Sequence, residues 1–307
     1  MTSTFWAYLG RRVLASLLFV LLVSSSALVL ARLMPGDATA SLVLTGADRA
    51  SVDAARVRLG LDQPVHVQLG DWLIGVSRLD LGQSSRFNQP VSQLLGGRLG
   101  RTASLAALAL LLATLIGIPA GVVSGSRPHG RLARAIAPVS TTLIACPPLI
   151  AVFALLLFAA TTGLLSVAPG SYAVPTLALA LPIAAGLERL QAQAMEDVLA
   201  APDIAAAAAR GVGPMRLIWV HAARQALQPV LGVYGIVIGS LFSGSLAVEV
   251  VTSWPGLGWL TYEALIARDL YLLAGCALAG AAFIAAGNLA ADALRALADP
   301  RVRGGWV

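Results

Sequence analysis

Long apolar runs separated by short polar stretches dominate this chain. Apolar runs of about 20 residues are long enough to cross the hydrocarbon core of a bilayer as a helix. We predict six spans, at about 13–33, 103–123, 135–160, 174–187, 229–250 and 272–289. The fourth is short and contains Pro182. The pattern predicts an all-α integral membrane protein in which residues 1–307 form one transmembrane domain.

The first polar segment, residues 34–100, is too polar to span a membrane. Apolar positions recur with helical spacing in 53–61 and again in 66–73. We therefore expect a small helical segment outside the membrane, on the extracytoplasmic side.

The second polar segment, residues 188–228, carries an alanine run from Ala205 to Ala209 that should be helical. Gly211 is a helix-ending residue, and Pro214 can open a second helix toward His221. Two short helices around a glycine break form a knob that can fit a socket on another protein. A plain loop containing a helix would give the same pattern, so both interpretations remain open at this point.

Composition supports the membrane assignment. The chain is 58% hydrophobic and 12% charged, with a mean hydropathy of +0.81. Its formal charge of +6 comes from arginine, because the sequence contains no lysine. A phosphate-binding loop of the GxxxxGK[ST] type is therefore impossible. If ATP drives this protein, another chain must bind it.

Arginines gather at the ends of apolar runs, which favours membrane orientation over nucleic-acid binding. The segments that we expect to be cytoplasmic hold Arg11, Arg12, Arg127, Arg131, Arg134, Arg189, Arg210, Arg216, Arg224, Arg295, Arg301 and Arg303. The two short outer loops hold Arg268 alone. This bias predicts that both termini are cytoplasmic.

Polar and helix-breaking residues inside the spans are candidates for a pathway or gate. Pro147 and Pro148 should break or kink the third span. Ser240 and Ser243 lie in a glycine- and serine-rich fifth span, where small residues serve close helix packing or line a pathway. Glu249, at the outer end of that span, is either functional or simply reaches the interface.

Recognisable catalytic chemistry is missing from the sequence. Neither HExxH nor GxSxG occurs, and the three histidines fall in three different segments. Cys146 and Cys276 support neither a disulfide assignment nor a metal site. We expect a protein that is not an enzyme and binds no cofactor itself.

Several motifs occur in an order that resembles ATP-binding-cassette importer permeases, in the oligopeptide/dipeptide/nickel branch. They are Arg11-Arg12, Pro35-Gly36-Asp37, Arg210-Gly211, His221-Ala222, Pro229, and Glu249 followed by Pro255-Gly256-Leu257-Gly258. The resemblance runs nearly end to end. It departs from the general pattern at Ala205, where an acidic residue is usual, and at Arg210, where lysine is usual.

The resemblance implies a permease subunit in a bacterial inner membrane that forms half of a pathway for peptides or related small solutes. Its implied partners are a second homologous permease, two ATPase subunits that bind ATP and Mg²⁺, an extracytoplasmic substrate-binding protein and lipid, with no nucleic acid. The mechanism would be alternating access. The implied ATPase-coupling residues are Asp203, Ala205, Ala206, Ala207, Arg210, Gly211, Val212 and Arg216.

A self-contained ion-driven carrier or channel is the alternative. Such carriers usually place ionisable groups at mid-membrane, and the predicted span centres lack them. An intramembrane protease or lipid-modifying enzyme would need a catalytic constellation that the sequence does not show.

Overall fold

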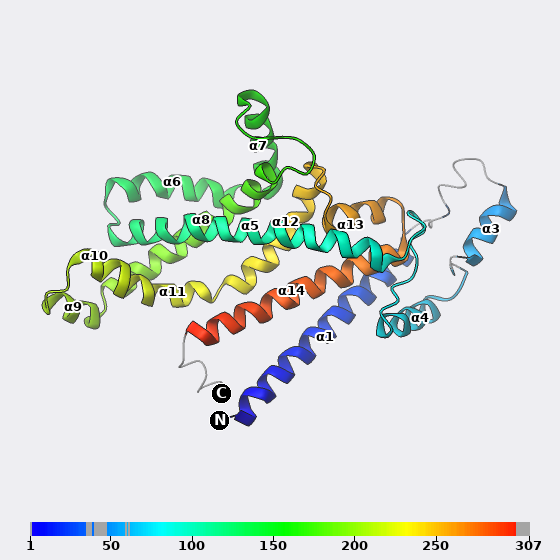
Figure 1. Cartoon of the computed structure of the whole chain (residues 1–307), viewed down its shortest axis with the longest axis horizontal. Coiled ribbons are helices and arrows are strands. Elements are labelled where there is room, and N and C mark those ends of the chain that lie inside the picture. Colours follow the sequence, from blue (N-terminus) through cyan, green and yellow to red (C-terminus); the bar gives the residue numbers. More distant parts are fainter. Residues whose placement is uncertain (1, 35–38, 40–47, 59, 61, 299–307) are drawn as a thin grey trace. The chain divides into compact units, whose positions relative to one another are not determined.

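The computed structural model describes residues 2–34, 39, 48–58, 60 and 62–298. Most of them are helical (Figure 1), and within these ranges the β-structure consists of an isolated bridge between Gln83 and Pro90. The helices are α1 (Thr2–Leu33), α3 (Arg49–Arg58), α4 (Val65–Ser77), α5 (Val91–Ser126), α6 (Arg131–Ala145), α7 (Pro148–Thr162), α8 (Ala173–Leu199), α9 (Pro202–Ala209), α10 (Pro214–Arg216), the π-helix η1 (Leu217–Ala222), α11 (Ala223–Leu231), α12 (Tyr234–Val251), α13 (Leu257–Ile266) and α14 (Leu270–Ala298). The Pro35-Gly36-Asp37 turn lies outside the described residues.

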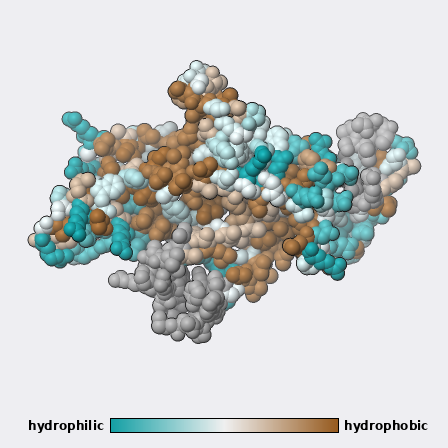
Figure 2. Space-filling model, viewed as in Figure 1, coloured by the Kyte–Doolittle hydropathy of each residue, from teal (hydrophilic) through white to brown (hydrophobic). Residues whose placement is uncertain are grey.

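The predicted all-α membrane fold is confirmed. Among the described residues, α1, α5, α8, α12 and α14 are long and apolar enough to cross a membrane, and α6 with α7 would make a sixth span as a bent pair. Hydrophobic side chains cover α7 (Figure 2), and its Leu157 is 67% exposed. Such a surface suits contact with lipid.

The third predicted span, 135–160, forms two helices rather than one. α6 and α7 meet at an angle of 113°. Pro147 is extended, with ψ 145°, and Pro148 is the first residue of α7. Neither proline has an N–H to donate, so the α-helical hydrogen bonds cannot continue through this point.

Two further helices extend beyond their predicted limits, and one predicted span is interrupted. α5 begins at Val91, inside the predicted first polar segment. α14 spans Leu270–Ala298, past both ends of predicted 272–289. Predicted span 229–250 is interrupted between α11 and α12, at Gly232 and Val233.

α8 continues to Leu199, well past the predicted end of the fourth span at residue 187. The charged residues that suggested an end there are held by neighbouring helices. Ser124 Oγ donates to Glu188 Oε1 at 2.5 Å, and Arg189 Nη1 donates to Thr141 Oγ1 at 3.2 Å. Glu188 is buried, and its hydrogen bond to Ser124 satisfies one of its oxygens there. The second polar segment therefore leaves the long helix later than the sequence indicated.

The chain divides into two compact units. Unit 1 is built around Ser104–Trp254, with residues 286–298, and the described part of unit 2 lies within Trp6–Ala103 and Pro255–Ala285. In unit 1, α8 packs against α6, α7, α11 and α12. Its buried apolar residues, among them Ala178, Leu179 and Leu187, lie at the centre of the main hydrophobic cluster.

Glycines on α5 allow its backbone to touch α8. Gly117, Gly121 and Gly125 recur every four residues, so they lie on one face of the helix. A side chain at Gly121 would meet the Glu188 carbonyl oxygen at 2.5 Å and Gln191 Cβ at 2.6 Å. Gly117 and Gly125 face the carbonyl oxygens of Ala184 and Ala192 in the same way. The two helices are therefore packed as closely as two backbones allow.

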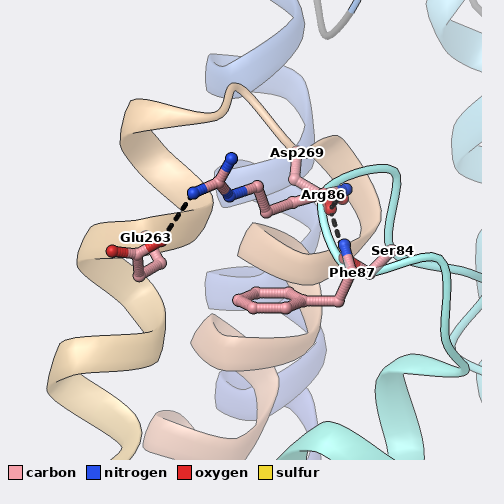
Figure 3. Close-up of polar contacts among 5 residues, drawn as sticks. All are labelled: Ser84, Arg86, Phe87, Glu263 and Asp269. Carbon is pink, nitrogen blue, oxygen red and sulfur yellow. Dashed lines mark hydrogen bonds and ion pairs between the residues drawn. The ribbon is translucent and has the colours of Figure 1, made fainter.

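In unit 2, a buried carboxylate fastens the loop before α5 to the start of α14 (Figure 3). Asp269 Oδ2 accepts hydrogen bonds from Ser84 Oγ at 2.6 Å and from the Arg86 backbone N at 3.0 Å. Its other oxygen caps α14 by accepting from the Leu272 backbone N at 3.1 Å. Ser84 and Asp269 are 2% and 1% exposed. Arg86 Nη2 also lies 3.5 Å from Glu263 Oε2, at the surface.

The close approach of α5 to α8 predicts that a glycine-to-valine substitution destabilises the protein strongly at some positions and little at others. Gly121→Val should destabilise the protein by about 1–3 kcal/mol or more, because the new side chain overlaps α8 backbone. Gly186→Val is the matched control, since Gly186 is on α8 and has open space around its Cβ position. Thermal unfolding of the purified chain in detergent checks this. Equal losses for the two variants would contradict the packing described here.

The Asp269 contacts predict that the neutral side chain of Ser84 stabilises the loop before α5 more than the charged side chain of Arg86 does. Ser84→Ala should weaken protection of the 84–91 amides by about 1–3 kcal/mol, because it removes a donor from a buried carboxylate. Arg86→Ala should cost less than about 1 kcal/mol, because the ion pair is partly exposed and the Arg86 backbone N still donates. Hydrogen exchange measures both, and the reverse order would refute this account.

Candidate functional site

A short helix with an exposed alanine face, α9, forms the turn between α8 and α11 (Figure 1). Pro202 is its first residue, where a missing N–H costs nothing, and Asp203 places an acidic group in the first turn. Two linker residues, Ala200 and Ala201, separate α9 from the end of α8. A displacement of α9 must therefore be passed almost directly to α8.

Gly211 ends α9 in the left-handed conformation, with φ +83°. The Gly211 N–H donates to the Ala208 carbonyl at 2.9 Å, and the Val212 N–H donates to the Ala207 carbonyl at 3.3 Å. This pair of hydrogen bonds is the Schellman arrangement, which favours glycine at its left-handed position. The predicted glycine break therefore has a defined geometry.

One face of α9 is seated on the rest of unit 1. Ile204 is 3% exposed and belongs to a cluster formed with Val122, Met195, Ala222 and Ala226. Ala207, one turn later, is also buried.

The opposite face of α9 is open. Ala205, Ala206 and Arg210 are exposed, as is Arg216 on α10. Figure 2 shows hydrophilic surface around this turn. Of the predicted coupling residues, Ala207 is thus part of the seat, Val212 is half-buried, and the others face outward. The exposed part of α9 therefore combines a low alanine surface with the longer charged side chains of Asp203 and Arg210.

Asp203 ties α9 to α11. Its Oδ2 accepts a hydrogen bond from Gln225 Nε2 at 2.8 Å. This bond, followed by bonds from the Asp203 and Ile204 backbone N–H groups, holds the pKa of the Asp203 carboxyl below its ordinary value. A depressed pKa means that the contact stabilises the fold above the ordinary pKa and is lost as the pH falls through the lowered one.

A π-helix, η1, lies between α10 and α11 and carries His221 in its last turn. Such wide turns are rare and often occur at functional sites. The sequence predicted a single helix here. Gln225 was also missed, because nothing local in the sequence indicates that it meets a side chain 22 positions away.

The predicted pathway residues differ in exposure and in position. Ser240 and Ser243 are exposed on α12, near the 76% exposed Ile236. Pro148 lies beside Gly244, whose added Cβ would meet Pro148 Cγ at 3.6 Å, and Pro147 precedes it as the N-cap of α7. The start of α7 and the serine face of α12 are therefore neighbours. Glu249, in contrast, has no exposed surface.

Family models match nearly the whole chain. Residues 117–304 match the family described as "Binding-protein-dependent transport system inner membrane component". Residues 5–106 match a second family, described as "Binding-prot-dependent transport system membrane comp, N-term". Both units of the structure are thus covered.

Relatives of similar length support the match. A putative peptide transport system permease protein of Brucella abortus is 34% identical over 310 residues, covering 97% of this chain and 99% of the relative. The oligopeptide transport system permease protein AppB of Bacillus subtilis is 32% identical over 312 residues, covering 96% and 99%.

A solved structure shows the same fold. A chain of the MetNI methionine ABC transporter in an inward-facing conformation aligns with a TM-score of 0.59 at 18% identity, over 67% of this chain and 97% of that chain. The family match and the curated relatives show that the chain belongs to the binding-protein-dependent transport system inner membrane components. It is a multi-pass inner-membrane permease subunit of an ATP-driven importer.

Proposed function

We propose that this permease forms half of a translocation pathway for peptides or related small solutes. The names of the curated relatives support the solute class, since they include peptide and oligopeptide permeases. A second homologous permease would supply the other half, and an extracytoplasmic binding protein would deliver the solute. Both termini would be cytoplasmic, as the arginine distribution predicts.

The exposed face of α9 is the observation that carries the coupling part of the proposal. Each of two ATPase subunits would hold one α9, with Arg210 and Arg216 meeting acidic groups around the groove. ATP and Mg²⁺ would be bound by those subunits, in agreement with the missing lysine of this chain. Hydrolysis would then be performed by the partners, and this chain would carry out no reaction of its own.

The attachment of α9 supports a mechanism of alternating access. Force on α9 reaches α8 across the two alanines, and α8 is in backbone contact with α5. On the other side, force passes through η1, Pro229 and the break at Gly232 before it reaches α12. In this proposal, the short α8 connection is the stiffer one and the longer α12 connection is the more compliant one. Closure of the ATPases would therefore move α8 with α5, and α12 with Ser240 and Ser243 would adjust its angle.

One observation favours a different class, an ion-driven carrier. Glu188 and Glu249 are buried within helices long and apolar enough to span the membrane, α8 and α12. Buried carboxylates in spans often serve proton or ion movement. Glu188 is hydrogen-bonded to Ser124, which also gives it a structural role.

Reconstitution separates the two classes. In proteoliposomes holding the complete assembly, we expect uptake of a labelled oligopeptide that requires ATP and the binding protein. Omission of the ATPase subunits should abolish it. Uptake by this chain alone, driven by a proton or sodium gradient, would establish the carrier and end the present proposal.

Gly211 predicts a specific coupling defect. Gly211→Val forces a β-branched residue into the left-handed region, at a cost of about 1–2 kcal/mol, and should misplace α9. We expect solute uptake per ATP hydrolysed to fall about tenfold, the factor that 1.4 kcal/mol gives.

Gly213→Val is the matched control for this prediction. Gly213 also has open space around its Cβ position, but it is extended, with φ −59° and ψ 147°. Uptake per ATP should stay near the parent value in this variant. If Gly211→Val keeps the parent ratio as well, the assignment of α9 as the coupling helix is wrong.

A further inference from the structure

We propose that Gln225 is a positioning residue for ATP coupling, acting as a strut that fixes the orientation of α9 against α11. The strut is the Gln225–Asp203 hydrogen bond, 2.8 Å long, between two elements that are joined through the whole turn. The role in coupling rests on the proposed function of α9. The strut itself is a property of this chain alone.

The seat of α9 is too small to fix its orientation. Two buried side chains, Ile204 and Ala207, anchor an eight-residue helix. They lie three positions apart, in one narrow line along the helix. Alanine offers no side chain to interlock with neighbours. Rotation of α9 about that line is therefore weakly opposed by apolar packing.

The Asp203 contact lies off that line, because consecutive residues of a helix point about 100° apart. Asp203 directly precedes Ile204, at the end of α9 that joins α8. Together, Ile204, Ala207 and Asp203 define three points of attachment, which is the minimum that fixes a body against rotation.

The strut also closes the compliant side of the turn. Apart from it and from the apolar cluster that Ile204 shares with Ala226, α9 is linked to α11 through Gly211, the short α10 and the π-helix η1. These elements can change their backbone angles, so part of an applied displacement would be absorbed there. With the strut in place, α9 and the first turn of α11 move together. Gln225 therefore adds a polar link beside that apolar cluster, and a larger part of a push on α9 reaches α11 while this link is present.

Hydrogen exchange of the full chain in lipid nanodiscs tests the strut without any partner. Gln225→Ala should make the amides of Ala205–Ala209 exchange about threefold faster, since one solvent-accessible, charge-assisted bond is lost. Gln228→Ala is the matched control, because Gln228 is exposed on the same helix, and it should leave these rates unchanged.

A second pair of variants isolates the contact. Asp203→Ala combined with Gln225→Ala should accelerate exchange no more than Asp203→Ala alone, because either change removes the same bond. Gln225→Arg should restore protection while Asp203 is present and should fail to do so in Asp203→Ala. Equal exchange in the Gln225→Ala and Gln228→Ala variants would overturn the strut.

The coupling role needs the reconstituted assembly. Gln225→Ala should lower the labelled oligopeptide taken up per ATP by about threefold, with unchanged amounts of co-purified ATPase, and Gln225→Arg should recover the ratio. A purely structural residue would change yield or ATPase content instead. If exchange responds as expected and the ratio does not, the strut exists but the positioning role is refuted. An assembly without an ATPase would refute the proposed function, leaving the exchange result intact.

Discussion

Backbone contact between α5 and α8 is the constraint on which unit 1 depends. The hydrophobic effect does not drive helices together in lipid, so helix pairs are held by close packing and interhelical hydrogen bonds. The glycines at 117, 121 and 125 supply the first, and the Ser124–Glu188 bond supplies the second. α8 also touches most of the other helices of the unit. Most helices of unit 1 are therefore positioned against α8.

Buried polar side chains are all the more informative in such a chain, because each must find a partner away from water. Glu188 finds one on the neighbouring helix, and Asp269 finds several on a loop far away in the sequence. Both carboxylates thereby fix the relative placement of two segments. Asp269 also caps α14, because its other carboxylate oxygen accepts a hydrogen bond from the Leu272 backbone N.

The two connections of α9 along the chain differ in build, and the proposed coupling mechanism uses this difference. α8 meets α9 through two residues, whereas α9 reaches α12 through a glycine turn, a π-helix, a proline and a second break. In the proposed mechanism, the short connection to α8 would transmit a push on α9, and the longer connection to α12 would allow the pathway helix to adjust. Both connections lie in one continuous segment and differ in backbone geometry.

The sequence by itself determined the membrane class, the break at Pro147–Pro148 and the glycine end of α9. Each of these follows from local properties: apolar length, a missing N–H, or a residue that tolerates positive φ. The family motifs also follow from local order along the chain, and the comparisons confirmed the family that they indicated.

Tertiary structure decided the rest. Whether a glycine is a contact, as at Gly121, or faces open space, as at Gly186, depends on which helix lies opposite. The same holds for Glu188, which resembled the end of a span and proved to be buried in one. Ser84 meets Asp269 across 185 positions, and Gln225 meets Asp203 across 22. Pattern and propensity describe the neighbours of a residue along the chain, whereas these contacts join residues that only folding brings within hydrogen-bonding distance.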